Sequence, residues 1–453
     1  MEIGEETANP SATVAILCPY LFFSVAFEGV LKRLPHAEIV PDFTAVPPGK
    51  QYPEEEKVRF HESLSARGLP WRDIERTRLA PSEFFSKYGT LVMPYYGGWA
   101  EHVATRQHRK ARIFYSSSKD LWVFSLNNIF FDRIFTPGPY FTDVLTKLYG
   151  AHGVEALSTG EPKLDSLAGM SAGQARAELG LKGERPVALI VLTWGALSAF
   201  DRLKGALVPL CEKFDVVFKM HHMAQVYEPD LFKAFTGTRI QIIGQNIPIT
   251  TALAAADVVV SDGSGAIFDA LLADKPIVVS DTIGESESSF FAETPFYGIW
   301  QDRLTGVATS RSSIEQEVKR NLKIGPVLPL YRESVPNSVV EEALREAIEH
   351  TERYAEARKE VLERFTAIDG RAAERVAEGI EALSRISYDD VGKRRESLLA
   401  KLVRDFDERC REYHRSKGNE ELAIVQARLE VFERIRHLPL SQRLTAIAHE
   451  FLS

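Results

Sequence analysis

Ten apolar runs rich in Val, Ile, Leu and Phe recur along the first 281 residues, separated by helical or loop segments. They occupy residues 13–20, 89–96, 111–117, 132–138 and 154–160, and then 186–194, 214–221, 240–244, 257–262 and 275–281. These runs are continuous rather than alternating, which is typical of strands buried on both faces in parallel sheets. The sequence therefore predicts an α/β chain in which a doubly wound parallel sheet occurs twice.

The 453 residues exceed what one hydrophobic core usually supports, so two domains and an appendage are expected. We place the first domain at 1–170 and the second at 171–387, where charged helices close the second domain. Residues 388–453 show helical stretches with apolar stripes and form a predicted all-helical extension. This extension could fold back, form a homo-oligomer or dock on a membrane, although its nearly balanced charges give no strongly basic membrane-binding face.

Net charge, cysteine content and the N-terminal sequence limit the partners and the cell compartment that we expect for this protein. The net charge of −8 and the dispersed basic residues argue against electrostatic binding to nucleic acid. Cys18, Cys211 and Cys410 form no CxxC pair, which favours a reducing compartment and argues against a disulfide framework or a thiolate zinc site. The acidic N-terminus precedes an apolar run that is interrupted and too short to span a bilayer. We expect a cytoplasmic protein, with peripheral contact at the inner face of the cell membrane left open.

A Ser/Gly-rich turn follows the run at 257–262 and precedes a segment whose apolar positions lie on one face of a helix. The candidate ligand-binding residues of this stretch are Asp262, Gly263, Ser264, Gly265 and Asp281. Ser264 and Gly265 fall at the helix N-terminus, where unpaired backbone N–H groups and the helix dipole attract anions such as a diphosphate. The alternative is that Ser264 caps the helix and the glycines only make the turn.

Two other runs end in side chains suited to a ligand. The run at 214–221 delivers Lys219, His221 and then His222 to the carboxyl edge of the sheet, and Lys and His suit phosphate oxygens and a developing negative charge. Successive strand residues point to opposite faces, so at most one of the two histidines enters the site, and a buried core histidine is the alternative. At the end of 186–194, either Thr193 donates to a ligand or the segment is a plain turn with Trp194 in the core.

The N-terminal half carries candidates for the opposite side of the site. They are Gly97, Gly98, His102, His108, Ser117, Lys119 and Gly138. Glycine turns permit close approach of a substrate, and an imidazole is the commonest acid or base near neutral pH. The basic cluster at 106–110 could meet an anionic acceptor or a membrane surface, or form a solvated helix face.

Six segments occur in an informative order. They are 135–140 with its Pro-Gly turn, TGEPKLD (159–165), LTW (192–194), KMH (219–221), ADVVVSDGSGAIFDALLADKPIVV (256–279) and IDGRAAERV (368–376). In this order they resemble the CDP-glycerol glycerophosphotransferase family, the teichoic-acid and capsule polymerases and primases. The resemblance covers roughly 110–387 and is most specific in the last two segments. It implies a GT-B fold, in which two Rossmann-like domains face a cleft that holds CDP-glycerol or a similar CDP-alditol.

The resemblance also implies roles for single residues. His221 matches the family histidine beside the donor diphosphate, Lys219 matches its basic neighbour, and Ser264 matches the first serine of a Ser-Ser pair. Gly265 and Gly263 replace a serine and a tyrosine of the family, and His222 stands where the family has proline, so the identity of the donor is left open. The His-Gly pair that serves as acceptor base in the family has no counterpart at 115–120. His102, His108 or an Asp would then supply the base, or the reaction differs.

The first hypothesis is therefore a transferase that moves a glycerol-phosphate or related polyol- or sugar-phosphate from a CDP-activated donor to a hydroxyl of a glycan or lipid-linked acceptor. We expect no cofactor and no essential metal, because GT-B sites usually work through helix and side-chain charge and no DxD signature stands out. The alternatives are a GT-B glycosyltransferase that uses a UDP- or GDP-sugar, a UDP-GlcNAc 2-epimerase-like isomerase, and a non-catalytic scaffold. The sequence leaves open the acceptor and whether transfer is single or repeated.

Overall fold

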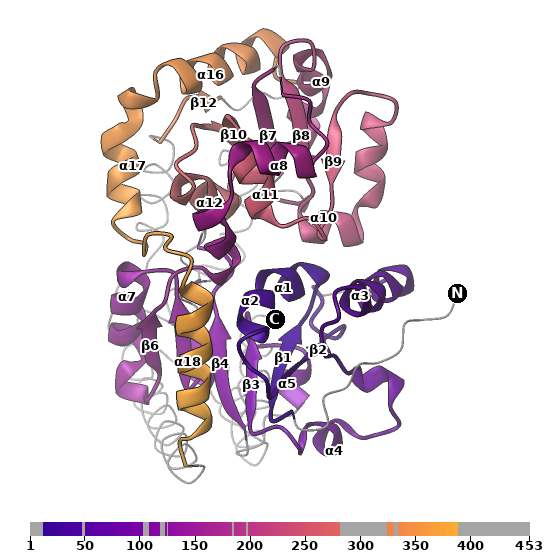
Figure 1. Cartoon of the computed structure of the whole chain (residues 1–453), viewed down its shortest axis with the longest axis vertical. Helices are drawn as coiled ribbons and strands as arrows, with labels where there is room; N and C mark the ends of the chain where they lie inside the picture. Colours follow the sequence, from indigo (N-terminus) through magenta and orange to yellow (C-terminus); the bar gives the residue numbers. More distant parts are fainter. Residues whose placement is uncertain are drawn as a thin grey trace, which may run out of the picture.

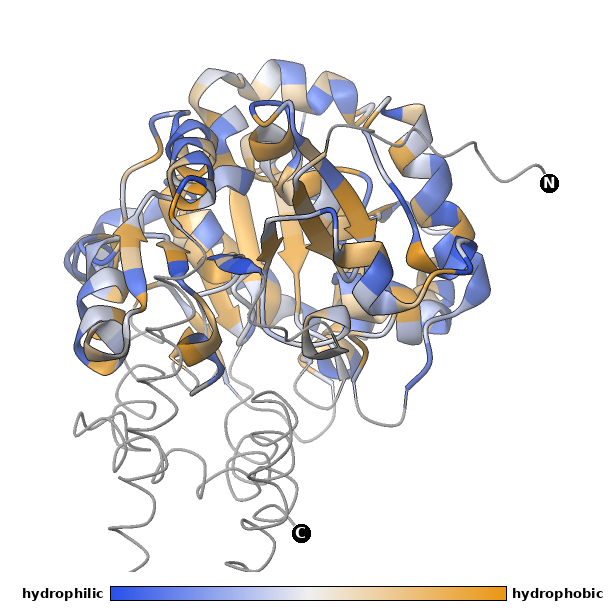
Figure 2. Cartoon of the chain, turned by 90° about the horizontal axis from the view of Figure 1, so that it is seen from below, coloured by the Kyte–Doolittle hydropathy of each residue, from blue (hydrophilic) through white to orange (hydrophobic). Residues whose placement is uncertain are grey.

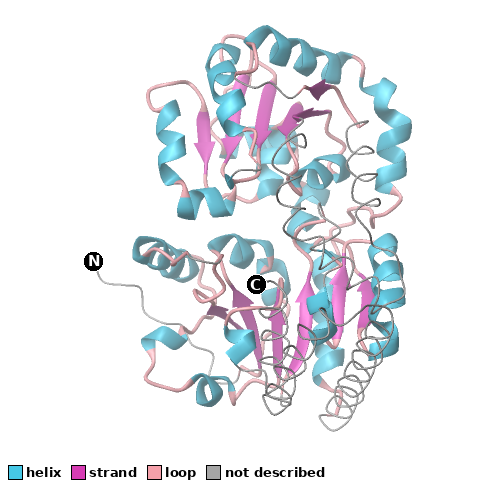
Figure 3. Cartoon of the chain, turned by 180° about the vertical axis from the view of Figure 1, so that it is seen from behind, coloured by secondary structure: helices cyan, strands magenta, loops and turns pink. Residues whose placement is uncertain are grey.

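The computed structural model describes residues 12–47, 50–102, 108–117, 123–124, 126–183, 185–195, 198–280, 324–329 and 334–387, and these form two parallel sheets stacked end to end (Figure 1). Asp281, Lys119 and the predicted extension at 388–453 lie outside the described residues. Helices flank both sheets (Figure 3). The prediction of an α/β chain with two doubly wound sheets is confirmed.

The first sheet has the strand order β2-β1-β3-β4-β5-β6, and all of its pairings are parallel. Its strands are β1 Val14–Cys18, β2 Ala37–Pro41, β3 Thr90–Met93, β4 Arg109–Ile113, β5 Arg133–Thr136 and β6 Glu155–Ser158. The helices around it are α1 Leu21–Ala26, α2 Glu28–Leu31, α3 Glu54–Ala66, α4 Pro81–Phe85, α5 Trp99–His102 and α7 Pro139–Tyr149, with 3₁₀ turns at Ile74–Arg76, Leu126–Phe130, Gly150–His152 and Pro162–Gly169 (η4). Strand order reverses between β1 and β3, so the loops after these two strands are where an open α/β sheet usually receives a ligand.

The second sheet has the order β12-β11-β10-β7-β8-β9, again parallel throughout. Its strands are β7 Val187–Val191, β8 Asp215–Lys219, β9 Gln241–Ile243, β10 Val258–Ser261, β11 Ile277–Ser280 and β12 Val327–Leu328. The helices around it are α8 Ala172–Glu178, α9 Phe200–Leu210, α10 His222–Tyr227, α11 Ile249–Ala255, α12 Ala266–Leu272, α16 Asn337–Glu349 and α17 Ala355–Leu362, with 3₁₀ turns at Pro229–Phe235 and Thr351–Tyr354. In order of appearance the strands run 3-2-1-4-5-6, the Rossmann arrangement, and the reversal lies between β7 and β10.

The chain returns to the first domain at its described C-terminal end. Helix α18, Ala372–Ser384, lies along the face of the first sheet (Figure 1), where Arg133 Nη1 donates to the Gly379 carbonyl at 2.5 Å and the hydroxyls of Thr90 and Ser384 are 2.8 Å apart. The sequence alone grouped this helix with the second domain, at 171–387. Helical periodicity gives the apolar face of α18 but not the sheet against which that face packs.

Two of the motif segments meet at this crossing. Asp165 of TGEPKLD accepts the backbone N–H groups of Ala372 and Ala373 at 2.9 and 2.7 Å, and so holds the first turn of α18. Arg375 of IDGRAAERV donates to the Thr159 carbonyl at 2.8 Å. These two motifs therefore fasten the returning helix to the first domain, and this contact gives them a structural reason to occur together.

Strand β2 escaped the sequence prediction. Its five residues include Glu38 and end in Pro41, so they do not form an apolar run. Glu38 is nevertheless fully buried, because the Lys87 ammonium lies 2.5 Å away and the Tyr88 hydroxyl also donates to this carboxylate. The proline is tolerated because β2 is at the edge of the sheet.

The strands form the cores of both domains, and they are mainly hydrophobic whereas the surrounding helices carry hydrophilic outer faces (Figure 2). Every residue of β1, β7, β10 and β11 is buried, as continuous apolar runs require. Within the part of the chain that the structure describes, no helix is both long and apolar enough to cross a membrane.

Candidate active site between the two domains

A pocket lies where the carboxyl ends of the two sheets face each other. Its walls are Phe22, Tyr115, Ser116 and Lys163 from the first domain, and Val191, Leu192, Lys219, Met220, His221, His222, Gln245, Ile249, Ser264, Gly265, Ala266 and Asp269 from the second. Five residues predicted from the sequence, Lys219, His221, His222, Ser264 and Gly265, are thus brought together. The pocket holds about 90 Å³, well below the roughly 300 Å³ at which small-molecule sites begin. A whole nucleotide would therefore extend beyond this pocket.

Lys219 is one of two buried lysines that line this pocket. Its side chain is at the end of β8, and its Nζ donates to the Gly244 carbonyl at 2.5 Å. Burial penalises the ammonium and lowers the pKa of Lys219 to about 7. An anion in the pocket would favour the charged form.

His221 lies beside it, at the N-terminus of α10. Its Nδ1 accepts the backbone N–H of Met223 at 3.2 Å, so the neutral ring carries its proton on Nε2. A ring held in this tautomer presents a hydrogen-bond donor, which suits a phosphate oxygen.

His222 also lines the pocket, and its ring stacks on that of His221 at 4.3 Å between centroids. The expectation that at most one of the two histidines enters the site is therefore wrong, because β8 ends at Lys219 and strand alternation does not extend to these residues. The His222 ring also stacks on Phe22 of the first domain at 5.0 Å between centroids, and Tyr20, Phe23 and Tyr115 surround it. Burial, with smaller contributions from nearby cations, holds the pKa of His222 well below its usual range. The neutral ring therefore serves as an aromatic contact between the domains.

The turn at 262–265 is held by a buried carboxylate. Asp262 Oδ1 accepts the N–H groups of Thr193 and Ser264 at 2.8 and 3.2 Å, and Oδ2 accepts that of Ala199 at 3.0 Å. Asp262 is fully buried, so it fixes the loops after β7 and β10 rather than pointing into the pocket. Ser264 Oγ accepts the Ala266 N–H at 3.4 Å, but the N-cap residue of α12 is Gly265, so Ser264 stabilises the turn before the helix and does not cap it.

Gly265 is the point of closest approach between this turn and the first domain. A Cβ atom at this position would lie 2.5 Å from Ser116 Oγ. Glycine in place of the family serine therefore allows Ser116, which follows β4, to pack directly on the turn. Trp194 is only partly buried, and its ring lies 6.3 Å from that of Tyr227.

Sequence reasoning missed a buried charge cluster in the same wall. Lys163 Nζ lies 2.8 Å from Asp269 Oδ1, 3.4 Å from Glu161 Oε2 and 2.7 Å from the Tyr115 carbonyl oxygen. Ser117, predicted on the acceptor side, donates to Glu161 Oε1 at 3.3 Å. Burial raises the pKa of Glu161 and of Asp269, more than Lys163 lowers it. The motifs contained all three charged residues, but no local pattern distinguishes them.

The other acceptor-side predictions fall elsewhere. His108 is buried at the N-terminal end of β4, where its Nδ1 is 2.8 Å from the Tyr88 carbonyl oxygen. It is thus at the edge of the sheet opposite the pocket, which does not fit the predicted catalytic role. Gly138 lies against the backbone of Arg364 and Phe365, where a Cβ would clash, so it serves the chain crossing between the domains rather than an acceptor.

Gly97 and Gly98 do follow the carboxyl end of β3. Gly98 lies beside the buried carboxylate of Asp42, which accepts the Trp99 N–H at 3.0 Å and whose pKa is raised to about 6 by burial. His102 ends α5, and its side chain is outside what the structure describes.

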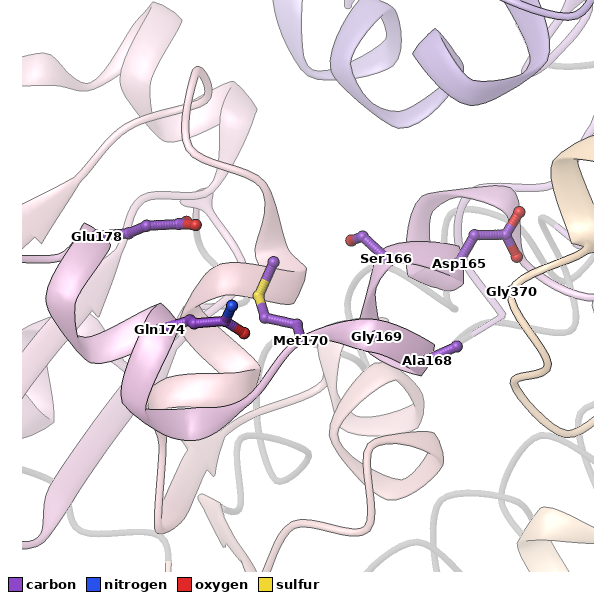
Figure 4. Close-up of a pocket in the computed structure, with 8 residues that line it drawn as sticks. All are labelled: Asp165, Ser166, Ala168, Gly169, Met170, Gln174, Glu178 and Gly370. Atoms are coloured by element: carbon purple, nitrogen blue, oxygen red, sulfur yellow. The ribbon is translucent and has the colours of Figure 1, made fainter.

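A second hollow, of about 600 Å³, opens where η4 passes into α8 (Figure 4). Its walls are Asp165, Ser166, Ala168, Gly169, Met170, Gln174, Glu178 and Gly370. Although larger, it contains none of the predicted site residues. The smaller pocket is the better candidate because cations, a helix-initiating turn and both domains converge there. Among the described residues, no cluster of His, Cys, Asp or Glu could hold a metal ion.

The low pKa of Lys219 predicts how ligand binding depends on pH. Above about pH 7 the free protein has lost the proton that an anionic ligand needs, so affinity is expected to fall about tenfold per pH unit. Calorimetric titration with a nucleoside diphosphate from about pH 6 to about pH 9 measures this. The Lys219→Arg variant stays charged and should lose the pH dependence. Constant affinity of the wild type across that range would contradict the assignment.

Part of the chain, which includes most of this site, is similar to a known family. Residues 102–282 match the family described as CDP-Glycerol:Poly(glycerophosphate) glycerophosphotransferase. No curated protein matches the chain. The chain is similar in structure to a variant of the Wall Teichoic Acid Polymerase TagF with CDPG, at 12% identity and a TM-score of 0.53 over 85% of this chain and 91% of that one.

Two further solved structures are similar. A TagF variant without that ligand in its description has 14% identity and a TM-score of 0.53, over 84% of this chain and 90% of that one. The UDP-GlcNAc 2-epimerase from Neisseria meningitidis bound to UDP-GlcNAc has 12% identity and a TM-score of 0.46, over 82% and 99% of the two chains. At such identities TagF supports the fold, which is GT-B. The family match, over residues 102–282, confirms the resemblance drawn from the motifs.

Proposed function

We propose that this protein transfers a glycerol-phosphate, or a related polyol- or sugar-phosphate, from a CDP-activated donor to a hydroxyl of a glycan or lipid-linked acceptor in the synthesis of a cell-surface polymer. The observation that carries the proposal is the convergence of Lys219, His221 and the turn at 264–266 in one interdomain pocket, within the segment that matches the family. A lipid-linked acceptor would place the reaction at the inner face of the cell membrane.

In the proposed reaction the acceptor oxygen attacks the distal phosphorus of the donor in line. A new P–O bond forms between the acceptor oxygen and the distal phosphorus. The bond from the distal phosphorus to the bridging oxygen of the diphosphate breaks, and CMP leaves with that oxygen. The Lys219 ammonium and the His221 Nε2–H are placed to stabilise the charge that develops on CMP.

The attacking hydroxyl must also lose a proton. Among the described residues that line the pocket, Asp269 is the one carboxylate, and it lies with Glu161 on either side of Lys163. A raised pKa makes a carboxylate a stronger base than one in water. We propose that Asp269 and Glu161 together accept this proton, the role that a histidine has in the family.

A ligand screen tests the proposal. Thermal-shift or calorimetric titration of the full chain with CMP, CDP, CDP-glycerol, UDP and UDP-GlcNAc should show stabilisation by the cytidine compounds. Release of CMP from CDP-glycerol in the presence of candidate acceptors then measures transfer. Stabilisation by uridine nucleotides alone would overturn the proposal in favour of a sugar-nucleotide enzyme.

A further inference from the structure

Gln245 is a buried amide in the wall of the interdomain pocket that no motif singles out. It follows β9 in the second domain, is 2% exposed, and lines the pocket together with Lys219 and His221. Amides at such positions make hydrogen bonds with both ends when the structure is complete.

The orientation of this amide is fixed by the first domain. The backbone N–H of Phe22, near the start of α1, donates to Gln245 Oε1 at 3.2 Å. The reversed orientation would set the amide NH₂ against another donor, so only one orientation is compatible with this contact. Nε2 must therefore point away from Phe22.

In that orientation Nε2 is buried and, among the described residues, has no hydrogen-bond partner. The residue cannot easily turn to find one, because its own N–H donates to Gln225 Oε1 at 2.8 Å and the preceding Gly244 carbonyl accepts from Lys219. A buried donor without an acceptor is costly, and native proteins usually retain one where a ligand or water completes it.

We propose that Gln245 is a positioning and specificity residue: Nε2 donates to a phosphate oxygen of the nucleoside diphosphate donor while Oε1 holds Phe22, so that donor binding and the docking of the first domain are coupled. A phosphate oxygen is the acceptor because the pocket also presents Lys219 and His221. Phe22 contributes a second contact to the same junction through its ring, which stacks on His222. This inference rests on the proposed function for the identity of the donor.

The substitution Gln245→Glu separates the two ends of the amide. The carboxylate still accepts the Phe22 N–H, but it has no N–H group to donate and it repels phosphate. We expect a loss of CDP and CDP-glycerol affinity of about tenfold to a hundredfold, and no loss for cytidine, which has no phosphate. Gln245→Met removes both contacts and should lower the apparent melting temperature as well as the affinity.

Gln174→Glu is the matched control, because Gln174 is exposed and glutamate preserves its capping box with Ser171. In turnover, Gln245→Glu should raise KM for the donor more than it lowers kcat. Unchanged CDP-glycerol affinity in Gln245→Glu, or an equal loss for cytidine, would overturn the inference. If the wild type binds UDP rather than CDP, the proposed function fails and the same comparison is made with UDP, whereas no nucleotide binding at all overturns both.

Discussion

The substitution His221→Ala is expected to lower CMP release from CDP-glycerol by about 10²–10³-fold, because it removes one positioned donor from the leaving phosphate. Alanine also removes the contact between Nδ1 and the Met223 N–H, which caps α10. His221→Asn keeps a good capping residue and loses the reach of the imidazole. Both variants should therefore lose turnover, while only His221→Ala should lose stability.

Single-turnover measurements of CMP with saturating donor separate chemistry from binding. The exposed His36 offers a matched control, since His36→Ala changes the same residue type away from the pocket. A wild-type rate in His221→Asn would show that the imidazole has no part in the reaction. A normal rate with a higher KM would show that it contributes only to binding.

Replacing Lys163 by methionine is expected to have the largest effect on stability. Lys163 is the buried cation between Glu161 and Asp269, and the pair with Asp269 joins the two domains. Breaking a buried ion pair from one side typically costs about 3–5 kcal/mol, since the remaining charge is left buried without its partner. Thermal unfolding should show a marked decrease in the midpoint, and Lys163→Met with Asp269→Asn should recover part of it.

The pH dependence of Lys163→Met has a definite sign. Buried carboxylates have pKa values above those of the unfolded chain, so the folded state binds more protons and gains stability as pH falls through the raised pKa. The deficit of the variant should thus be smaller in mild acid than at neutral pH. Lys204→Met is the control, because Lys204 pairs with Asp201 at the exposed surface, where such pairs contribute about 0–1 kcal/mol. A loss of stability no larger than that of the control would show that Lys163 does not stabilise the contact between the domains.

Much of the fold follows from the apolar runs. All ten predicted runs overlap a strand, because strands buried on both faces are rich in apolar residues. The run at 111–117 shows the limit, since β4 ends at Ile113 and the residues that follow leave the sheet to face the pocket. Strand β2 was missed because Glu38 is buried through partners about fifty residues away, which no local pattern reveals.

The residues of the candidate site were likewise predicted only in part. Lys219, His221 and Ser264 could be predicted because each follows directly from the end of a parallel strand, and the sheet brings such ends to one edge. His108 was placed wrongly because a residue type suited to catalysis can stand at either end of a strand, and here it precedes β4. Gly138 looked like a site glycine but accommodates the backbone near Phe365.

The sequence by itself determined two parallel sheets, the order of the turns at their carboxyl edges and the residues that these turns present. These features depend on local periodicity and on the regular geometry of parallel strands. Only the tertiary structure decided how the domains meet: Lys163 with Asp269 across 106 residues, and Phe22 with Gln245 across 223. Such contacts depend on how two separately folded surfaces pack, and no periodic pattern encodes that packing.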